Sequence, residues 1–115
     1  MPSILELLKE ARRPTVERIT LGGKEFFVRD MAPTQRTVYV QLVIQAAAEN
    51  AAVPPHVVVA QGICNEDGTG PTQEERNAIA EEMATLSGQE LQEAARKVLD
   101  LSGLTRKSQD RAEKN

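Results

Sequence analysis

The sequence feature that most constrains the fold is a pair of glycines, Gly22-Gly23, between two short stretches of mixed apolar and polar residues. Adjacent glycines supply the positive φ angles that a two-residue hairpin turn requires. The pattern predicts antiparallel strands at about residues 17–21 and 24–29. A hairpin alone is marginal in water, so its apolar face must lie against helices or against another molecule. The apolar residues of that face are Ile19, Phe26 and Val28.

The rest of the chain predicts helices. Aromatic residues make up only 3% of the sequence, so the core must be built from aliphatic side chains and alanine. The segment 53–63 fits either a short buried helix or a strand, and its two prolines and Gly62 favour the helix. The other predicted helices span residues 3–12, 33–49, 72–84 and 88–102. We therefore expect a mainly α protein with a small N-terminal β-hairpin (α+β), with four to five helices in a single domain.

Local signals mark the ends of these helices. Three pairs match the capping box, in which a Ser or Thr begins a helix and a Glu follows three positions later. The pairs are Ser3 with Glu6, Thr72 with Glu75, and Ser87 with Glu90. Gly103 is a stop signal for the last helix. The helix at 33–49 has apolar residues over a wide arc, which predicts a central helix that is touched on several sides.

Charge is distributed unevenly along the chain, whose net charge is −3. Residues 62–95 carry eight acidic and one basic side chain, whereas residues 96–115 carry three acidic and six basic ones. Solvated helix faces explain this pattern, and so does attraction between copies or with a partner. A head-to-tail contact between the two regions would generate rings or open spirals. We expect a folded domain at 1–104 and a charged flexible tail at 105–115.

Few features of the chain suggest chemistry. An EF-hand loop beginning at Asn65 would place Arg76 at its twelfth position, where calcium needs a bidentate glutamate. The stretch 65–70 is therefore predicted to be a turn. Cys64 and His56 are the only residues of their kinds and lack partners at metal-ligand or triad spacing. We expect a buried thiol, a loop histidine, no metal, no cofactor and no enzymatic activity.

The composition also bears on the kinds of partner. An acidic chain with few aromatic residues argues against nucleic acid. No apolar run approaches the roughly 18 residues of a membrane span, so we expect no membrane partner.

Several segments stand in a recognisable order. They are EARRPTVERITLGGKEFFVRDM (10–31), the loop Asn65-Glu66-Asp67-Gly68, the helix start Thr72-Gln73-Glu74-Glu75, and LSGQELQEAARKVLDLSGL (86–104). The junction Val28-Arg29-Asp30 and the ending Leu101-Ser102-Gly103-Leu104 carry most of the pattern. Over about residues 10–104 this order resembles the tail assembly chaperones of long-tailed bacteriophages.

The resemblance implies a non-enzymatic factor that binds the tape measure protein, keeps it soluble and helps recruit tail tube protein. It also implies self-association into a spiral or weak oligomer, location in the host bacterial cytoplasm, and absence from the mature virion. A helical partner needs apolar surface to cover it, which we expect on the hairpin face and the final helix. The candidate residues are Ile19, Phe26, Val28, Leu91, Ala95, Val98, Leu99 and Leu101.

Two other functions are compatible with the sequence. A structural head–tail joining component, or another minor phage morphogenesis protein, would remain in purified virions, whereas a chaperone would not. A small cytoplasmic nucleic-acid-binding regulator would use the basic residues of 104–115. Its binding would be weak, non-specific and sensitive to salt.

Overall fold

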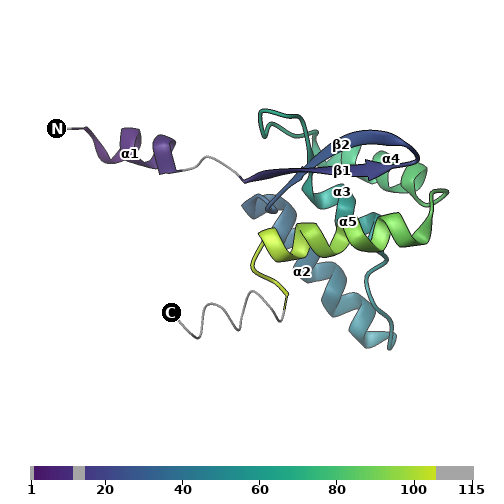
Figure 1. Cartoon of the computed structure of the whole chain (residues 1–115). Helices are drawn as coiled ribbons and strands as arrows, with labels where there is room; N and C mark the ends of the chain where they lie inside the picture. Colours follow the sequence, from purple (N-terminus) through teal and green to yellow (C-terminus); the bar gives the residue numbers. More distant parts are fainter. Residues whose placement is uncertain (1, 12–14, 106–115) are drawn as a thin grey trace.

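The computed structural model describes residues 2–11 and 15–105. These residues form five α-helices and a three-stranded antiparallel sheet (Figure 1). The elements are α1 (Ile4–Ala11), β1 (Val16–Leu21), β2 (Lys24–Arg29), α2 (Pro33–Ala48), α3 (Pro55–Gly62), β3 (Ile63–Cys64), α4 (Gln73–Met83) and α5 (Gly88–Leu101). The predicted α+β fold class is confirmed. Apart from Thr105, the charged tail expected at 105–115 lies outside the described residues.

The hairpin forms where the glycine pair predicts it. Gly22 and Gly23 have φ angles of +60° and +82°. Positive values at both central residues suit the right-handed twist of the flanking strands. β1 and β2 pair in register from Val16↔Arg29 to Leu21↔Lys24, so β1 begins one residue earlier than predicted. The short β3 adds to the other side of β2 and leaves β1 at a sheet edge.

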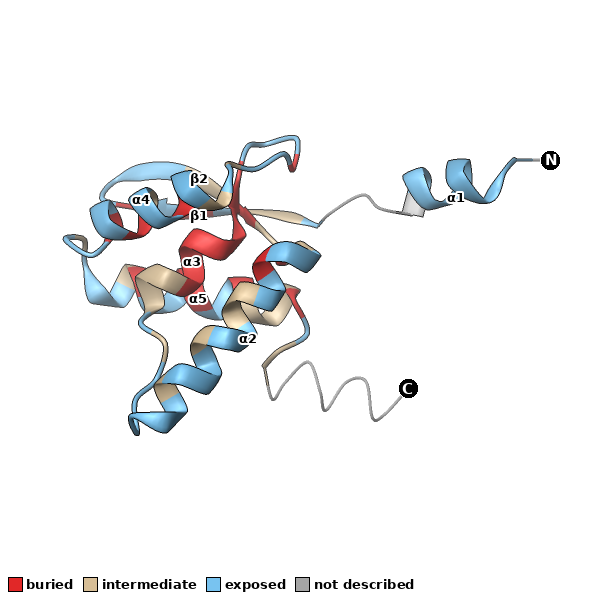
Figure 2. Cartoon of the chain, turned by 180° about the vertical axis from the view of Figure 1, so that it is seen from behind, coloured by how far each residue is buried: buried red, intermediate tan, exposed pale blue. Residues whose placement is uncertain are grey.

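The centre of the fold is α3. Val58, Val59 and Ala60 are each 3% exposed or less. α3 packs against α4, α5 and β2, and Figure 2 shows it as a buried helix among more exposed ones. Residues 55–62 of the segment 53–63 thus form a helix, as favoured from the prolines, and Ile63 begins β3.

The helix that the sequence predicts to be central, α2, lies at the periphery instead. Gln35 is its buried residue. Its first turn is fastened to the end of α5, because Arg36 Nη1 donates to the Ser102 carbonyl oxygen at 3.0 Å. The Ser102 hydroxyl also accepts from the Met31 amide at 2.9 Å. Beyond this anchor α2 projects from the body (Figure 1). The prediction was wrong because a wide apolar arc does not reveal whether anything covers it.

The helix-end signals at α1, α4 and the end of α5 are confirmed. Ser3 Oγ accepts from the Glu6 amide at 3.2 Å. Thr72 Oγ1 accepts from the Glu75 amide at 3.2 Å. Gly103 follows α5 with a φ angle of +72°, the left-handed conformation that commonly ends a helix.

The third capping pair is corrected by the structure. Ser87 occupies the N-cap position of α5, but its side chain makes no capping hydrogen bond. Glu90 Oε1 instead accepts from the Gly22 amide of the hairpin turn at 3.3 Å. The physical reason is tertiary: the turn lies against the first turn of α5, so the carboxylate serves a distant donor rather than its own helix end.

Candidate functional site

Most of the side chains expected to face a partner are buried within the chain. Five of the eight candidates are at most 6% exposed, namely Ile19, Val28, Leu91, Ala95 and Val98. They are buried because α5 packs against β1 and β2, so the two predicted apolar faces cover each other. Leu99 and Leu101 are half-buried against the same core. The expectation of an exposed surface is therefore corrected for the five buried side chains, whereas Leu99 and Leu101 keep partial exposure. Phe26 has a different position.

Phe26 lines an apolar groove of about 450 Å³ between the hairpin and α4. Ile79 of α4 and Leu86 beyond its end are half-buried beside it. The buried side chains of Leu21, Ile63 and Met83 also line the groove. Among its described lining residues, Glu82 is the one with a charge. A groove of this size and character fits aliphatic side chains of another molecule.

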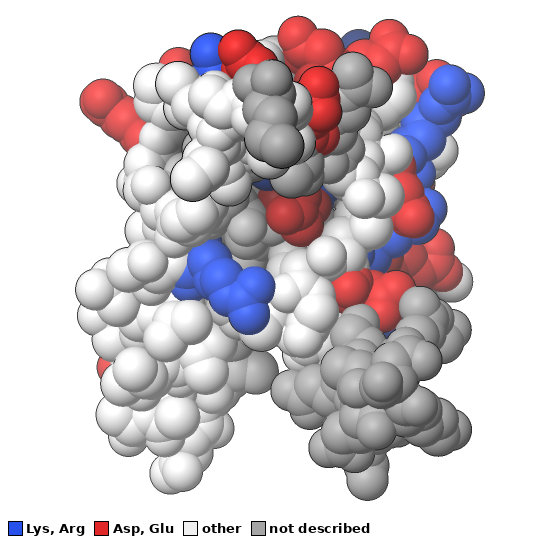
Figure 3. All heavy atoms as spheres, turned by 90° about the vertical axis from the view of Figure 1, so that its left-hand side faces the viewer, with Lys and Arg blue, Asp and Glu red and all other residues white. Residues whose placement is uncertain are grey.

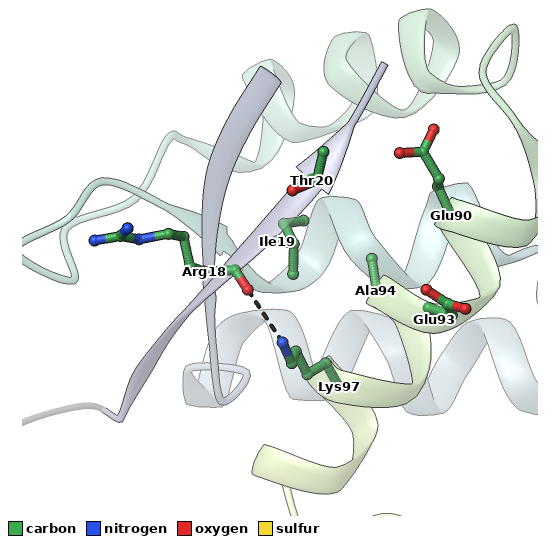
Figure 4. A pocket seen from close by; sticks show the side chains of 7 residues that line it. All are labelled: Arg18, Ile19, Thr20, Glu90, Glu93, Ala94 and Lys97. Carbon is green, nitrogen blue, oxygen red and sulfur yellow. Dashed lines mark hydrogen bonds between the residues drawn. The ribbon is translucent and has the colours of Figure 1, made fainter. Parts of the chain in front are cut away.

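A second cavity, of about 480 Å³, lies along the free edge of β1 (Figure 4). α5 supplies its other wall through Glu90, Glu93 and Lys97. Lys97 Nζ donates to the Arg18 carbonyl oxygen at 3.1 Å, while the Arg18 side chain points away from the cavity (Figure 4). A lysine whose ammonium group binds a backbone carbonyl oxygen of an edge strand hinders pairing of that strand with a further strand. We therefore assign this cavity a structural role, the protection of the sheet edge.

A third cavity, of about 450 Å³, is framed by the loop 67–71 and the β2–α2 junction. Arg29 Nη1 donates to the Gly68 carbonyl oxygen at 3.1 Å and so fixes the loop. Asp30 Oδ1 and Gln61 Oε1 are buried without a hydrogen bond, although Asp30 Oδ1 lies 3.5 Å from Arg29 Nε. Both atoms are acceptors, so N–H or O–H donors are what they would take up. The described lining residues include no serine, cysteine or histidine.

The loop that invited a calcium interpretation closes on itself. Asp67 Oδ1 accepts from the Thr69 hydroxyl at 2.6 Å and from the Thr69 amide at 3.0 Å. These two bonds hold the pKa of Asp67 below its ordinary value, and the bond from the Thr69 hydroxyl has the larger effect. The Asn65 backbone N–H donates to the Thr69 carbonyl oxygen at 2.7 Å. The predicted turn is confirmed. In the described ranges, no three His, Cys, Asp or Glu residues are grouped as metal ligands would be.

The single cysteine, Cys64, is buried, and the single histidine, His56, lies in a helix. Cys64 is 8% exposed and unbridged, as expected of a buried thiol. Burial raises its pKa, so the thiol keeps its proton near neutral pH and is a poor nucleophile. His56 belongs to the first turn of α3 rather than to a loop, which corrects the expectation for this residue.

The largest exposed apolar side chains lie where the sequence did not place a site. α2 exposes Val40, Val43 and Ile44 by 46%, 39% and 64%. No charged residue occurs from Thr37 to Ala48, and in Figure 3 the lobe that α2 forms at the bottom is almost entirely white. α1 exposes Ile4, Leu5, Leu7 and Leu8 by 47% to 77%. The available signal was the wide apolar arc of residues 33–49, which we interpreted as that of a central helix.

Any function must be argued from the residues of this chain, because the comparisons with known proteins give no match. None of the described helices has both the length and the apolar character needed to cross a bilayer. No protein-family model, curated protein or solved structure matches the chain.

Proposed function

We propose that the chain is a non-enzymatic assembly chaperone of the phage tail type, which binds an amphipathic helix of a tape measure protein. The observation that carries the proposal is the apolar groove between the hairpin and α4, where Phe26, Ile79 and Leu86 are half-exposed beside a buried floor. A helix can place apolar side chains into such a groove at positions i, i+3 or i+4, and i+7.

The surroundings of the groove favour a client with basic residues beside its apolar face. Residues 62–95, which include α4, carry eight acidic side chains and one basic one. Glu82 stands among the groove's lining residues, and Glu81 next to it is exposed. Complementary charge speeds encounter and selects partners, while apolar anchors supply most of the affinity.

In this proposal the protein acts in the host bacterial cytoplasm while tails are assembled. It holds the tape measure protein in solution, helps to recruit tail tube protein and is absent from the mature virion. A head–tail joining protein of similar size would instead be found in purified virions, so virion composition separates the two functions.

The test is co-expression with the protein encoded immediately downstream, measured as the soluble fraction of that client. We expect the native chain to keep a long helical client soluble. Ile79→Glu, which places a charge in the groove, should abolish that effect. Asn77→Glu is the matched control, because it adds the same carboxylate to an exposed position of α4 that does not line the groove.

A second variant covers the case in which Ile79→Glu destabilises the chain. Ala78 is exposed and lines the groove, so Ala78→Trp should fill it without removing core contacts. Loss of client solubility with Ala78→Trp, and retention with Asn77→Glu, supports the groove as the binding site. Equal client solubility with all the variants would show that the groove does not bind the client.

A further inference from the structure

α1 is a short amphipathic helix that stands apart from the body (Figure 1). It spans eight residues and is capped by Ser3. Its apolar side chains, Ile4, Leu5, Leu7 and Leu8, are exposed by 77%, 62%, 49% and 47%. Isolated helices shorter than about 12 residues are marginal in water, because most helix stability comes from packing of an apolar face. The apolar side chains of this helix therefore need a surface to pack against, and the rest of the chain does not cover them in the structure.

α2 supplies a surface of matching character. Its exposed residues Val40, Val43 and Ile44 are four positions apart at most and share an uncharged stretch of helix. An apolar helix face without charge favours another apolar helix over a charged ligand, because burying unpaired charges against it is costly. Glu6, Lys9 and Glu10 of α1 can stay in water while its leucines are covered.

The size of the two faces indicates how many contacts a stable assembly needs. At roughly 100 Å² per aliphatic side chain, the seven exposed side chains carry about 400 Å² of apolar surface. Because interfaces are roughly 57% apolar, one α1–α2 contact corresponds to about 700 Å² in total. That is below the roughly 1,200 Å² of a stable interface, whereas two such contacts reach about 1,400 Å².

In the structure a copy's own α1 does not cover its α2, and the apolar faces of both helices stay exposed. Four residues, 12–15, separate α1 from β1 and can span roughly 18 Å at most. Figure 1 places α1 on the opposite side of the molecule from the free end of α2. A second copy has no such restriction.

We propose that two copies of the chain exchange their N-terminal helices, with α1 of each packed on the exposed face of α2 of the other. The contact is isologous, since the same two faces meet twice about a two-fold axis. It differs from the head-to-tail electrostatic contact that the charge pattern suggests, and it does not rest on the proposed client.

The test is the mass of the full chain by light scattering or sedimentation, without any client, from roughly 1 to 100 µM. We expect a dimer that persists in roughly 1 M salt, because apolar contacts are not screened. A monomer throughout, as self-docking of α1 would also give, overturns the exchange. Dissociation by salt also overturns it, in favour of an electrostatic contact.

Two single variants locate the contact. Leu8→Asp in α1 and Ile44→Glu in α2 each place a charge at an exposed position, so the body should fold normally. Each should raise the dimer dissociation constant roughly 100-fold or more, because the charge is buried twice per dimer. Lys9→Glu and Gln45→Glu change exposed polar positions of the same helices and should leave the dimer intact. A dimer that withstands both Leu8→Asp and Ile44→Glu would rule out this interface.

Discussion

Arg76 is a charged residue that the fold places in its interior. It is 5% exposed, and in the described chain no carboxylate lies within ion-pair distance of it. Its guanidinium instead donates to three backbone carbonyl oxygens, those of Ala60 and Ile63 at 2.9 Å and that of Pro71 at 3.1 Å. Burial lowers its pKa from the ordinary value. The residue ties α4 to the end of α3, where both approach the sheet.

Replacement of Arg76 by alanine should lower the free energy of unfolding by about 3 kcal/mol, because two buried carbonyl groups and one part-buried carbonyl group lose their donor. Arg76→Lys should also destabilise, since one ammonium cannot reproduce the planar fork of donors. The measurement is urea denaturation followed by circular dichroism. Arg96→Ala on the exposed side of α5 is the control and should change the free energy by less than about 0.5 kcal/mol. Equal stability of the two alanine variants would contradict the structural role of Arg76.

At the scale of elements, the sequence predicts what local chemistry decides. The hairpin follows from φ angles that glycine adopts freely, and the start of α4 follows from the Thr72 hydroxyl and an amide three residues later. Both depend on atoms close together along the chain. They could therefore be placed to within a residue or so before any tertiary contact was known.

The positions of these elements relative to one another could not be predicted in this way. The apolar faces of α5 and of the hairpin are equally visible in the sequence, but only the packing shows that they cover each other. α2 gave the opposite result: its apolar arc resembles that of a core helix, but Val40, Val43 and Ile44 on it are exposed. Burial depends on contacts between residues far apart in the chain, and periodicity carries no information about the partner of an apolar face. The groove around Phe26 was therefore predicted only in part.

Gly62 shows how closely α3 and α5 approach. A Cβ atom at this position would lie 2.6 Å from Val98 Cγ1 and 2.9 Å from the Arg29 carbonyl oxygen. Gly62→Ala should therefore lower the free energy of unfolding by about 1 to 3 kcal/mol, through overpacking of the core. Gly88→Ala is the matched control, because a Cβ there meets no atom within 4 Å and alanine suits the first turn of α5. It should be neutral or stabilise by roughly 0.5 kcal/mol in thermal or urea unfolding. A Gly62→Ala chain as stable as Gly88→Ala would contradict this packing.

At the scale of the whole molecule, the two proposed surfaces belong to different elements. The radius of gyration is 15.1 Å, larger than the roughly 13 Å of a compact domain of this length. α1 and α2 project from the body (Figure 1). The groove lies on the hairpin and α4, apart from both projecting helices. A copy could thus hold a client and another copy at once.

This separation predicts that the two activities can be removed independently. Ile44→Glu should give a monomer that still keeps the client soluble, because it leaves the groove unchanged. Ala78→Trp should give a dimer that no longer does so. Light scattering and client solubility, measured on the same two preparations, check both. If either variant removed both activities while remaining folded, client binding and dimerisation would depend on each other, against this prediction.

The hydrogen bond from Arg36 to the Ser102 carbonyl oxygen fixes the first turn of α2 against the end of α5. Tyr39 of α2 also packs against the core, so the direction of α2 depends on both attachments. Loss of the hydrogen bond would free the first turn of α2 from the end of α5. The orientation of an assembly built on Val40, Val43 and Ile44 would then depend on a hydrogen bond at the other end of the helix.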